Sequence, residues 1–220
     1  MISTMKQATR NIFSRLNWKV YGPTLFTLIT LLSIIPCWIF LPERFAWENH
    51  LIENSQLLIL AGCFWIAIKS KSNKKLFNWV AMIAVILFLR EINCGRIFFP
   101  RPRPEGMAPT FYHWYEIIPN YWWRVPNAIY ACFMLYTIYY FFKNKLYKTL
   151  WDYAKFAKID CVNIICLFIG LIVGSISESR FMEDEMLEEL TETLFYVSFT
   201  VLVYLYSRYP DFSITKRETK

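Results

Sequence analysis

The sequence has little glycine and little histidine, with six glycines and two histidines in 220 residues. Several motifs that would assign a chemistry are also missing. There is no Cys-x-x-Cys pair, no His-Glu-x-x-His motif, no Glu-x-x-His pair and no repeated aspartate pattern. These absences exclude a zinc ribbon, a dithiol redox centre and the common zinc-hydrolase helix. The six cysteines lie in or beside apolar runs at unrelated spacings, which is typical of small buried apolar side chains.

What the chain does have is long hydrophobic runs, in a composition that is 56% hydrophobic with a mean hydropathy of +0.29. Such runs predict an all-α, polytopic membrane helix bundle rather than a soluble domain. We expect six transmembrane helices, at residues 24–41, 51–68, 76–98, 128–142, 159–176 and 187–206. No small-x-small cleavage site follows the first run, so we expect no removable signal there. The predicted organisation is a lead-in (1–23), one transmembrane domain (24–208) and a tail (209–220).

The charged residues predict the orientation of this bundle. The lead-in, the segments 69–75 and 143–158 and the tail contain all 13 lysines, whereas the three intervening loops carry only arginine as their basic residue. The acidic residues are distributed in the opposite way, with 13 of the 17 on the lysine-free side. Under the positive-inside rule both termini are cytoplasmic, an N-in/C-in arrangement that fits an even number of spans.

The net charge of +7 therefore predicts no nucleic-acid partner. The basic residues of the chain are interpreted as charges at the cytoplasmic membrane surface. The expected partners of that face are membrane lipids, and anionic lipid in particular. The lead-in carries Ile12, Phe13, Leu16 and Val20 at helical spacing, which indicates an interfacial amphipathic segment. We expect a multi-pass protein of the cell inner (plasma) membrane. The sequence makes no prediction about its oligomeric state.

The predicted spans cross the bilayer only if they include charged residues. The apolar part of the second run, 57–68, spans about 18 Å and that of the third, 76–89, about 21 Å, against a hydrocarbon layer of about 30 Å. We therefore expect the third helix to continue through Arg90 and Glu91 to Phe98. Charged side chains in a membrane face the bundle interior or a watery cavity. The sequence thus predicts an outward-facing polar pocket, walled by Glu53, Gln56, Arg90, Glu91, Asn93, Arg96, Glu178, Arg180, Glu185, Glu189 and Glu192.

Within this pocket the residue types indicate separate roles. Carboxylates suit general acid–base chemistry, and arginine forks suit phosphate or carboxylate groups. The candidate catalytic residues are Glu53, Glu91, Glu189 and Glu192. The candidate substrate-binding residues are Gln56, Arg90, Arg96 and Arg180. Internal Arg–Glu pairs that hold the helices together are the alternative interpretation.

The acidic segment before the last span divides into two groups. Glu185, Glu189 and Glu192 share one helical face, whereas Glu183, Asp184 and Glu188 point away from it and are expected to be solvated. Acidic residues are also favourable near a helix N-terminus because of the helix dipole. The segment is therefore interpreted either as one wall of the pocket or as acidic residues that stabilise a helix N-terminus.

A divalent metal is a possible cofactor, because both histidines fall on the predicted outer side near the carboxylates. His50 and His113 are the candidate metal ligands, and oxygen ligands with one or two imidazoles suit zinc, manganese, magnesium or calcium. An isolated surface role for each histidine is the alternative. The outer loop 99–127 is rich in Arg, Pro and aromatic residues and is interpreted either as a lid or headgroup contact over the pocket or as an interfacial aromatic belt.

Three stretches resemble a group of uncharacterised bacterial multi-span membrane proteins of about six spans. The stretches are the acidic and Gln-containing start of the second span, the Glu-x-x-x-Gly-Arg element at 91–96 and the Glu-Glu-x-x-Glu start of the last span at 188–192. The matching residues are Glu48, Glu53, Gln56, Glu91, Gly95, Arg96, Glu188, Glu189 and Glu192. The resemblance implies a shared set of pocket residues and names no reaction.

Three functions follow as hypotheses. The first is an enzyme acting on a lipid or lipid-linked substrate at the outer leaflet. The second is a non-catalytic membrane assembly or scaffold protein whose Arg–Glu pairs are structural. The third is a proton or cation transporter, which the sequence supports less, because no ionisable residue lies midway through a predicted span.

Overall fold

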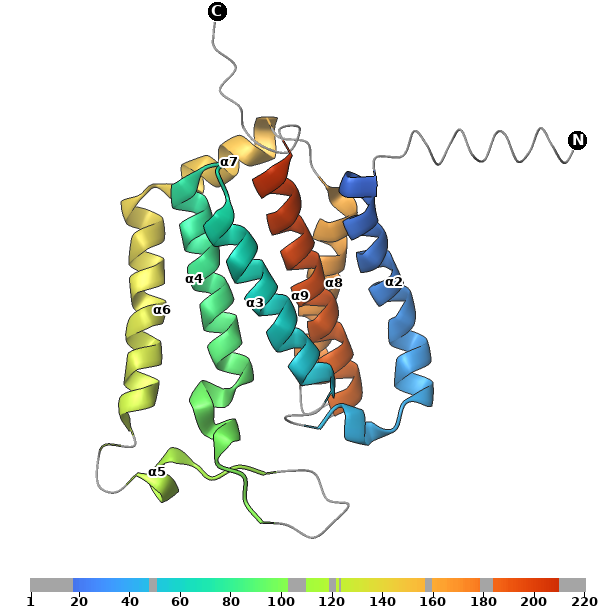
Figure 1. Ribbon diagram of the computed structural model, residues 1–220, viewed down its shortest axis with the longest axis vertical. Helices are drawn as coiled ribbons and strands as arrows, with labels where there is room; N and C mark the ends of the chain where they lie inside the picture. The colour runs from blue at the N-terminus through green and yellow to red at the C-terminus, as the bar shows by residue number, and fades with distance from the viewer. Residues whose placement is uncertain are drawn as a thin grey trace, which may run out of the picture.

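The computed structural model describes residues 18–47, 51–102, 110–118, 122, 124–156, 160–178 and 184–209. Within these residues, long helices stand side by side as one bundle (Figure 1). The long helices are α2 (Trp18–Phe40), α3 (Leu51–Lys69), α4 (Lys74–Glu91), α6 (Val125–Lys143), α8 (Cys161–Ser177) and α9 (Glu185–Arg208). The shorter ones are η1 (Glu43–Phe45), η2 (Asn93–Phe98), α5 (Trp114–Ile117) and α7 (Leu146–Phe156). The described residues form no β-strand, so the all-α prediction is confirmed.

The two ends of the bundle carry different elements. α7 lies across one end, where α2 begins, α3 leads into α4 and α9 finishes; η1, η2 and α5 lie at the other end (Figure 1). We call these the α7 end and the α5 end. Side-chain caps begin three of the long helices. Asn73 caps α4, Asp160 caps α8 and Asp184 caps α9, each accepting a hydrogen bond from a backbone N–H three residues later.

Four of the described helices are long and apolar enough to cross a membrane: Tyr21–Phe40 within α2, then α3, α6 and α9. α8 is apolar but has 17 residues, and α4 has 18 residues with lysines in its first turn and Arg90 and Glu91 at its end. The chain is therefore a helical protein with several apolar helices, as expected of an integral membrane protein. The prediction of six spans goes beyond these four helices.

α9 is the central helix of the bundle. Buried apolar side chains join α3 and α4 to α9 around Phe77, Val80 and Val203, and join α2 and α8 to α9 around Cys166 and Leu194. More than half of the apolar window of α9 is buried (56%), against 6% for α6, which packs at the periphery against α4. The side chains on the different faces of α9 therefore contact α2, α3 and α8, and to a smaller extent α4.

α8 packs against α9 at very short range. A Cβ atom placed on Gly170 would lie 2.7 Å from the carbonyl oxygen of Thr191 and 2.8 Å from the backbone nitrogen of Phe195. At Gly174 the nearest atom would be the Thr191 hydroxyl, at 3.3 Å. The spacing Gly-x-x-x-Gly puts both glycines on one face of α8, as in closely packed membrane helices. This short approach fixes the position of the first turns of α9.

Two expectations about the helices are wrong. The third helix does not continue to Phe98: α4 ends at Glu91 and is followed by a turn in which Asn93, Cys94 and Gly95 all have positive φ (47°, 53° and 94°). Such left-handed residues cannot extend an α-helix, and the turn that they form occupies the first half of η2. The segment 143–158, expected to be a loop, contains the amphipathic helix α7. The interfacial segment predicted for the lead-in lies mostly outside the described residues.

Candidate functional site

Gln56 of α3 and Glu189 of α9 join these two helices near the α5 end. The Gln56 side chain is fully buried, and its Nε2 donates hydrogen bonds to the Glu189 Oε2 (2.8 Å), the Glu189 carbonyl oxygen (3.0 Å) and the Thr193 Oγ1 (3.1 Å). The Gln56 Oε1 is also buried and has no hydrogen-bond partner within the described structure. Glu53, one turn earlier on α3, is 5% exposed and lies within electrostatic range of Glu189. The start of α3 thus places an amide and a carboxylate against the face of α9 predicted from the sequence.

Arg90 and Glu91 connect the end of α4 to the same face of α9. Arg90 forms an ion pair with Glu192, and its Nη1 donates to the Tyr196 hydroxyl (3.4 Å). Tyr196, which is fully buried, donates in turn to the Glu91 Oε1 (2.5 Å). The result is a chain of polar contacts, Glu192–Arg90–Tyr196–Glu91, which runs from the exposed Arg90 to the buried Tyr196 and Glu91. We call this chain, together with Glu53, Gln56 and Glu189, the polar network.

The structure therefore brings together six of the residues proposed from the sequence: Glu53, Gln56, Arg90, Glu91, Glu189 and Glu192. Tyr196 was missed, although its spacing of one turn from Glu192 places it on the same face. Glu185 does not join the network and is exposed. Arg180 and His50 lie outside the described residues.

The acidic segment before α9 is less solvated than expected. The Asp184 carboxylate caps α9 by accepting from the backbone N–H of Leu187 (2.9 Å) and also accepts from the Trp38 indole N–H (2.7 Å). Glu188 is half-buried and lies within electrostatic range of Glu178 and Glu192. The expectation that Asp184 and Glu188 are simply solvated is therefore wrong. These residues orient the start of α9 towards α2 and α8.

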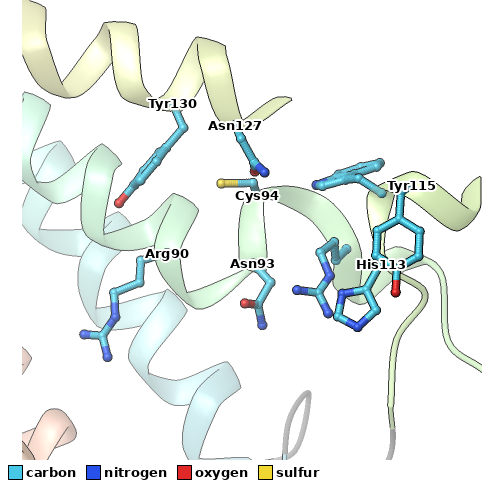
Figure 2. A pocket seen from close by; sticks show the side chains of 9 residues that line it. Arg90, Asn93, Cys94, His113, Tyr115, Asn127 and Tyr130 are labelled. Atoms are coloured by element: carbon cyan, nitrogen blue, oxygen red, sulfur yellow. The ribbon is translucent and has the colours of Figure 1, made fainter. Parts of the chain in front are cut away.

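A cavity of about 380 Å³ lies next to the polar network at the α5 end. Figure 2 shows Arg90 at one side of it and His113 with Tyr115 at the other, with Asn93 between them. Its lining residues come from α4, η2, α5 and α6: Arg90, Asn93, Cys94, Arg96, His113, Trp114, Tyr115, Asn127 and Tyr130. Two arginines and no carboxylate line this cavity, so its charge suits an anion. We call it the arginine cavity.

The turn after α4 shapes the arginine cavity. The left-handed conformations at Asn93 and Cys94 are unusual for residues other than glycine, and both side chains line the cavity. The turn is closed by a hydrogen bond from the Gly95 N–H to the Ile92 carbonyl (2.7 Å). Strained backbone of this kind is concentrated at functional sites. Because of the turn, Arg96 faces the cavity instead of continuing along α4.

The segment before α5 supports the far wall of the arginine cavity. Arg101 forms an ion pair with Glu116, whose carboxylate also accepts from the His113 N–H (2.7 Å). This backbone hydrogen bond and the Arg101 charge lower the pKa of Glu116, which lies outside the bundle helices. The His113 ring stacks on Tyr115 with centroids 5.2 Å apart. His113 is therefore held at the cavity wall beside Glu116 and lies apart from the carboxylates of the polar network.

A second, smaller hollow of about 230 Å³ lies on the other side of Arg90, between α4, α8 and α9. It is lined by Leu87, Arg90, Gly170, Leu171, Gly174, Ser175, Glu178, Glu192 and Phe195. Apart from Arg90, its charged lining residues are the two glutamates. We call it the glutamate hollow. Arg90 is thus shared by two hollows of opposite charge.

No three His, Cys, Asp or Glu side chains among the described residues gather in a way that could hold a metal ion. His113 lines the arginine cavity with Cys94, away from the network carboxylates described above. A metal at His50 and His113 stays a prediction, because His50 lies outside the described residues.

A separate polar cluster occupies the α7 end. Asn163 is fully buried, accepts from the Thr27 hydroxyl (2.6 Å) and donates to Thr24 (3.1 Å) and Asp160 (2.7 Å). Between this cluster and the polar network, α9 buries mainly apolar side chains such as Val197, Val201 and Leu205. The described residues thus place no continuous row of charged groups along α9 from one end to the other.

No family model, no curated protein and no solved structure matches this chain.

Proposed function

We propose that the chain is an integral membrane protein with six spans and both termini in the cytoplasm. α4 and α8 stand beside the four clear span candidates in the same bundle (Figure 1). The 17 residues of α8 rise about 26 Å, close to the hydrocarbon thickness of about 30 Å. The lysine-rich segments 69–75 and 143–155 lie at the α7 end, which supports a cytoplasmic position for that end.

The α7 helix supports an inner (plasma) membrane location with anionic lipid at its surface. It lies across the bundle end (Figure 1) and exposes Tyr147, Leu150 and Trp151 beside Lys148 and Lys155. Apolar and aromatic side chains flanked by lysines are typical of a helix that lies in the membrane interface and contacts anionic headgroups.

The biochemical function we propose is that of an enzyme acting on a phosphate-bearing lipid or lipid-linked substrate of the outer leaflet. The observation that carries this proposal is the position of Arg90, which lines both hollows and is paired with the half-buried Glu192. A guanidinium at a cavity wall binds phosphate oxygens well, and Arg96 offers a second one. Glu192 lines the glutamate hollow, where it would serve as general acid or base on the bound substrate.

The remaining network residues would act through Arg90 and α9. Tyr196 and Glu91 hold the Arg90 guanidinium in place from within the bundle. Gln56 and Glu189 fix α3 against the first turns of α9, and Glu53 is buried one turn before Gln56, so we assign all three a positioning role. The resemblance to the uncharacterised multi-span group fits this proposal, since the resembling residues include most of the polar network.

A second candidate function, a non-catalytic assembly or scaffold protein, is favoured by one observation. The contacts Gln56–Glu189, Arg90–Glu192 and Tyr196–Glu91 each join two different helices. Polar interhelical contacts of this kind stabilise membrane bundles without any chemistry.

The two functions are separated by the variant Glu192→Gln, with Glu185→Gln on the exposed side of the same helix as a control. Wild type and variants are reconstituted in vesicles of total membrane lipid, and lipid composition is followed by mass spectrometry while thermal unfolding is measured in parallel. We expect the wild type and Glu185→Gln to convert one class of phosphate-bearing lipid, and folded Glu192→Gln to leave it unchanged. If the wild type changes no lipid and Glu192→Gln lowers the melting temperature, the scaffold function replaces the enzyme.

A further inference from the structure

The glutamate hollow is layered along the bundle axis. Leu87 lies one turn before Arg90 on α4, and Phe195 lies about one turn after Glu192 on α9. On the opposite side of Glu192, towards the α5 end, lie Glu178 and, one turn earlier on α9, Glu188. From the bundle centre outwards, the hollow therefore runs from apolar side chains to a guanidinium and then to carboxylates.

The hollow also opens sideways from the bundle. Leu171, on the α8 wall, is 48% exposed, and Ser175 on the same wall is exposed as well. Gly170 and Gly174 place no side chain in the hollow, so its floor is formed by α9 itself. In a membrane this opening would face lipid chains and not water, which allows an amphiphile to enter laterally.

The charges on the two sides of Arg90 select the kind of amphiphile. Arg90 is balanced by Glu192, so Glu178 and the nearby Glu188 leave the outer part of the hollow with an excess of negative charge. The adjoining arginine cavity adds Arg96 and no carboxylate. A ligand that matches the charges of the glutamate hollow and of the adjoining arginine cavity needs a phosphate next to Arg90 and a cationic group a few atoms further out.

We infer that the glutamate hollow binds an amine-bearing zwitterionic phospholipid that enters from the bilayer between α4 and α8. Its acyl chain lies along Leu87, Leu171 and Phe195, its phosphate meets Arg90, and its ammonium group meets Glu178 and Glu188. The order chain, phosphate, amine in such a lipid matches the order of side chains in the hollow. This inference rests on the proposed function, which places the α5 end at the outer leaflet, and it names the substrate class.

The test uses lipid analogues with a photoactivatable acyl chain in nanodiscs that contain the full-length protein. One analogue is a phosphatidylethanolamine and the other a phosphatidylglycerol, which has the same phosphate and no amine. We expect the ethanolamine lipid to label peptides containing Leu171 or Phe195 about tenfold more than the glycerol lipid, equivalent to about 1.4 kcal/mol. The double variant Glu178→Gln/Glu188→Gln should remove this preference and keep the fold.

A second pair of variants tests the lateral opening. Ser175→Trp fills the hollow from its α8 wall and should abolish labelling of the Phe195 peptide. Ile172→Trp, on the lipid-facing side of α8, is the matched control and should leave labelling unchanged. Equal labelling by the two lipids, or full labelling of the Ser175→Trp protein, would overturn the inference. Labelling requires no turnover, so an ethanolamine preference without lipid conversion would support the binding site and remove only the enzyme function.

Discussion

At the scale of single residues, Tyr196 is the side chain on which the polar network depends most. Its hydroxyl receives a hydrogen bond from Arg90 and donates one to Glu91, so it joins the cation to a second, buried carboxylate. Glu91 is 7% exposed, which leaves it little access to water if this donor is removed. A buried acceptor that loses its donor costs more free energy than a hydrogen bond contributes on average.

We therefore predict that Tyr196→Phe lowers the free energy of unfolding by about 1–3 kcal/mol, because it leaves the Glu91 acceptor unsatisfied. Tyr136→Phe, on an exposed position of α6, is the control and should change stability by less than about 0.5 kcal/mol. Denaturant unfolding in detergent measures both. Equal stability of the two variants would show that the Tyr196 hydroxyl does not hold the network.

Sequence reasoning identified the charged members of the network because a charge inside an apolar run is costly and therefore conspicuous. It missed Tyr196, since a hydroxyl at the edge of an aromatic ring barely changes the hydropathy of the run. It also missed Asn127 and Tyr130 of α6, which complete the arginine cavity. Nothing in the local sequence of α6 indicates which of its sides faces α4.

At the scale of elements, α8 and α9 approach each other more closely at Gly170 than any other glycine of the described residues approaches a neighbouring helix. Gly170 lies against the backbone of α9, and backbone atoms have no rotamer with which to move away. Gly62, in the middle of α3, provides the opposite case, because nothing lies within 4 Å of the position of its missing Cβ.

We predict that Gly170→Ala destabilises the protein by about 1–3 kcal/mol, since the two helices must separate to admit the methyl group. Gly62→Ala should instead stabilise it by about 0.5–1 kcal/mol, because alanine restricts the unfolded chain and meets open space. Thermal unfolding of both variants in the same detergent gives the comparison. A neutral Gly170→Ala would mean that α8 and α9 are further apart than described.

The boundaries of the elements were predictable where apolar runs end at charges or caps. α3, α6 and α8 begin and end within three residues of their predicted limits. The end of α4 was not predictable in this way, since the charge pattern required a longer helix to cross the bilayer. Asn93 and Gly95 tolerate left-handed backbone, and together they were the available signal for the turn.

At the scale of the whole molecule, the orientation stays a prediction that rests on the lysine distribution. We predict that alkaline phosphatase, inserted as a sandwich fusion, is active after His113 and after Glu178 and inactive after Ser72 and after Lys145. The enzyme folds only where disulfides form, outside the cytoplasm. Activity after Glu178 tests α8 as a span, and the contrast between Ser72 and His113 tests α4. Inactive enzyme after Glu178 would reduce the number of spans.

The central position of α9 has a consequence for biosynthesis. α9 follows every other described helix in the chain, yet α2, α3 and α8 all pack against it. During translation these helices therefore leave the ribosome before their common partner has been synthesised. Until α9 is made, Gln56 of α3 and the glycine face of α8 lack their partners, and Arg90 of α4 lacks Glu192. A ribosome that stops before residue 185 should thus release a polypeptide that cellular proteases recognise as unassembled.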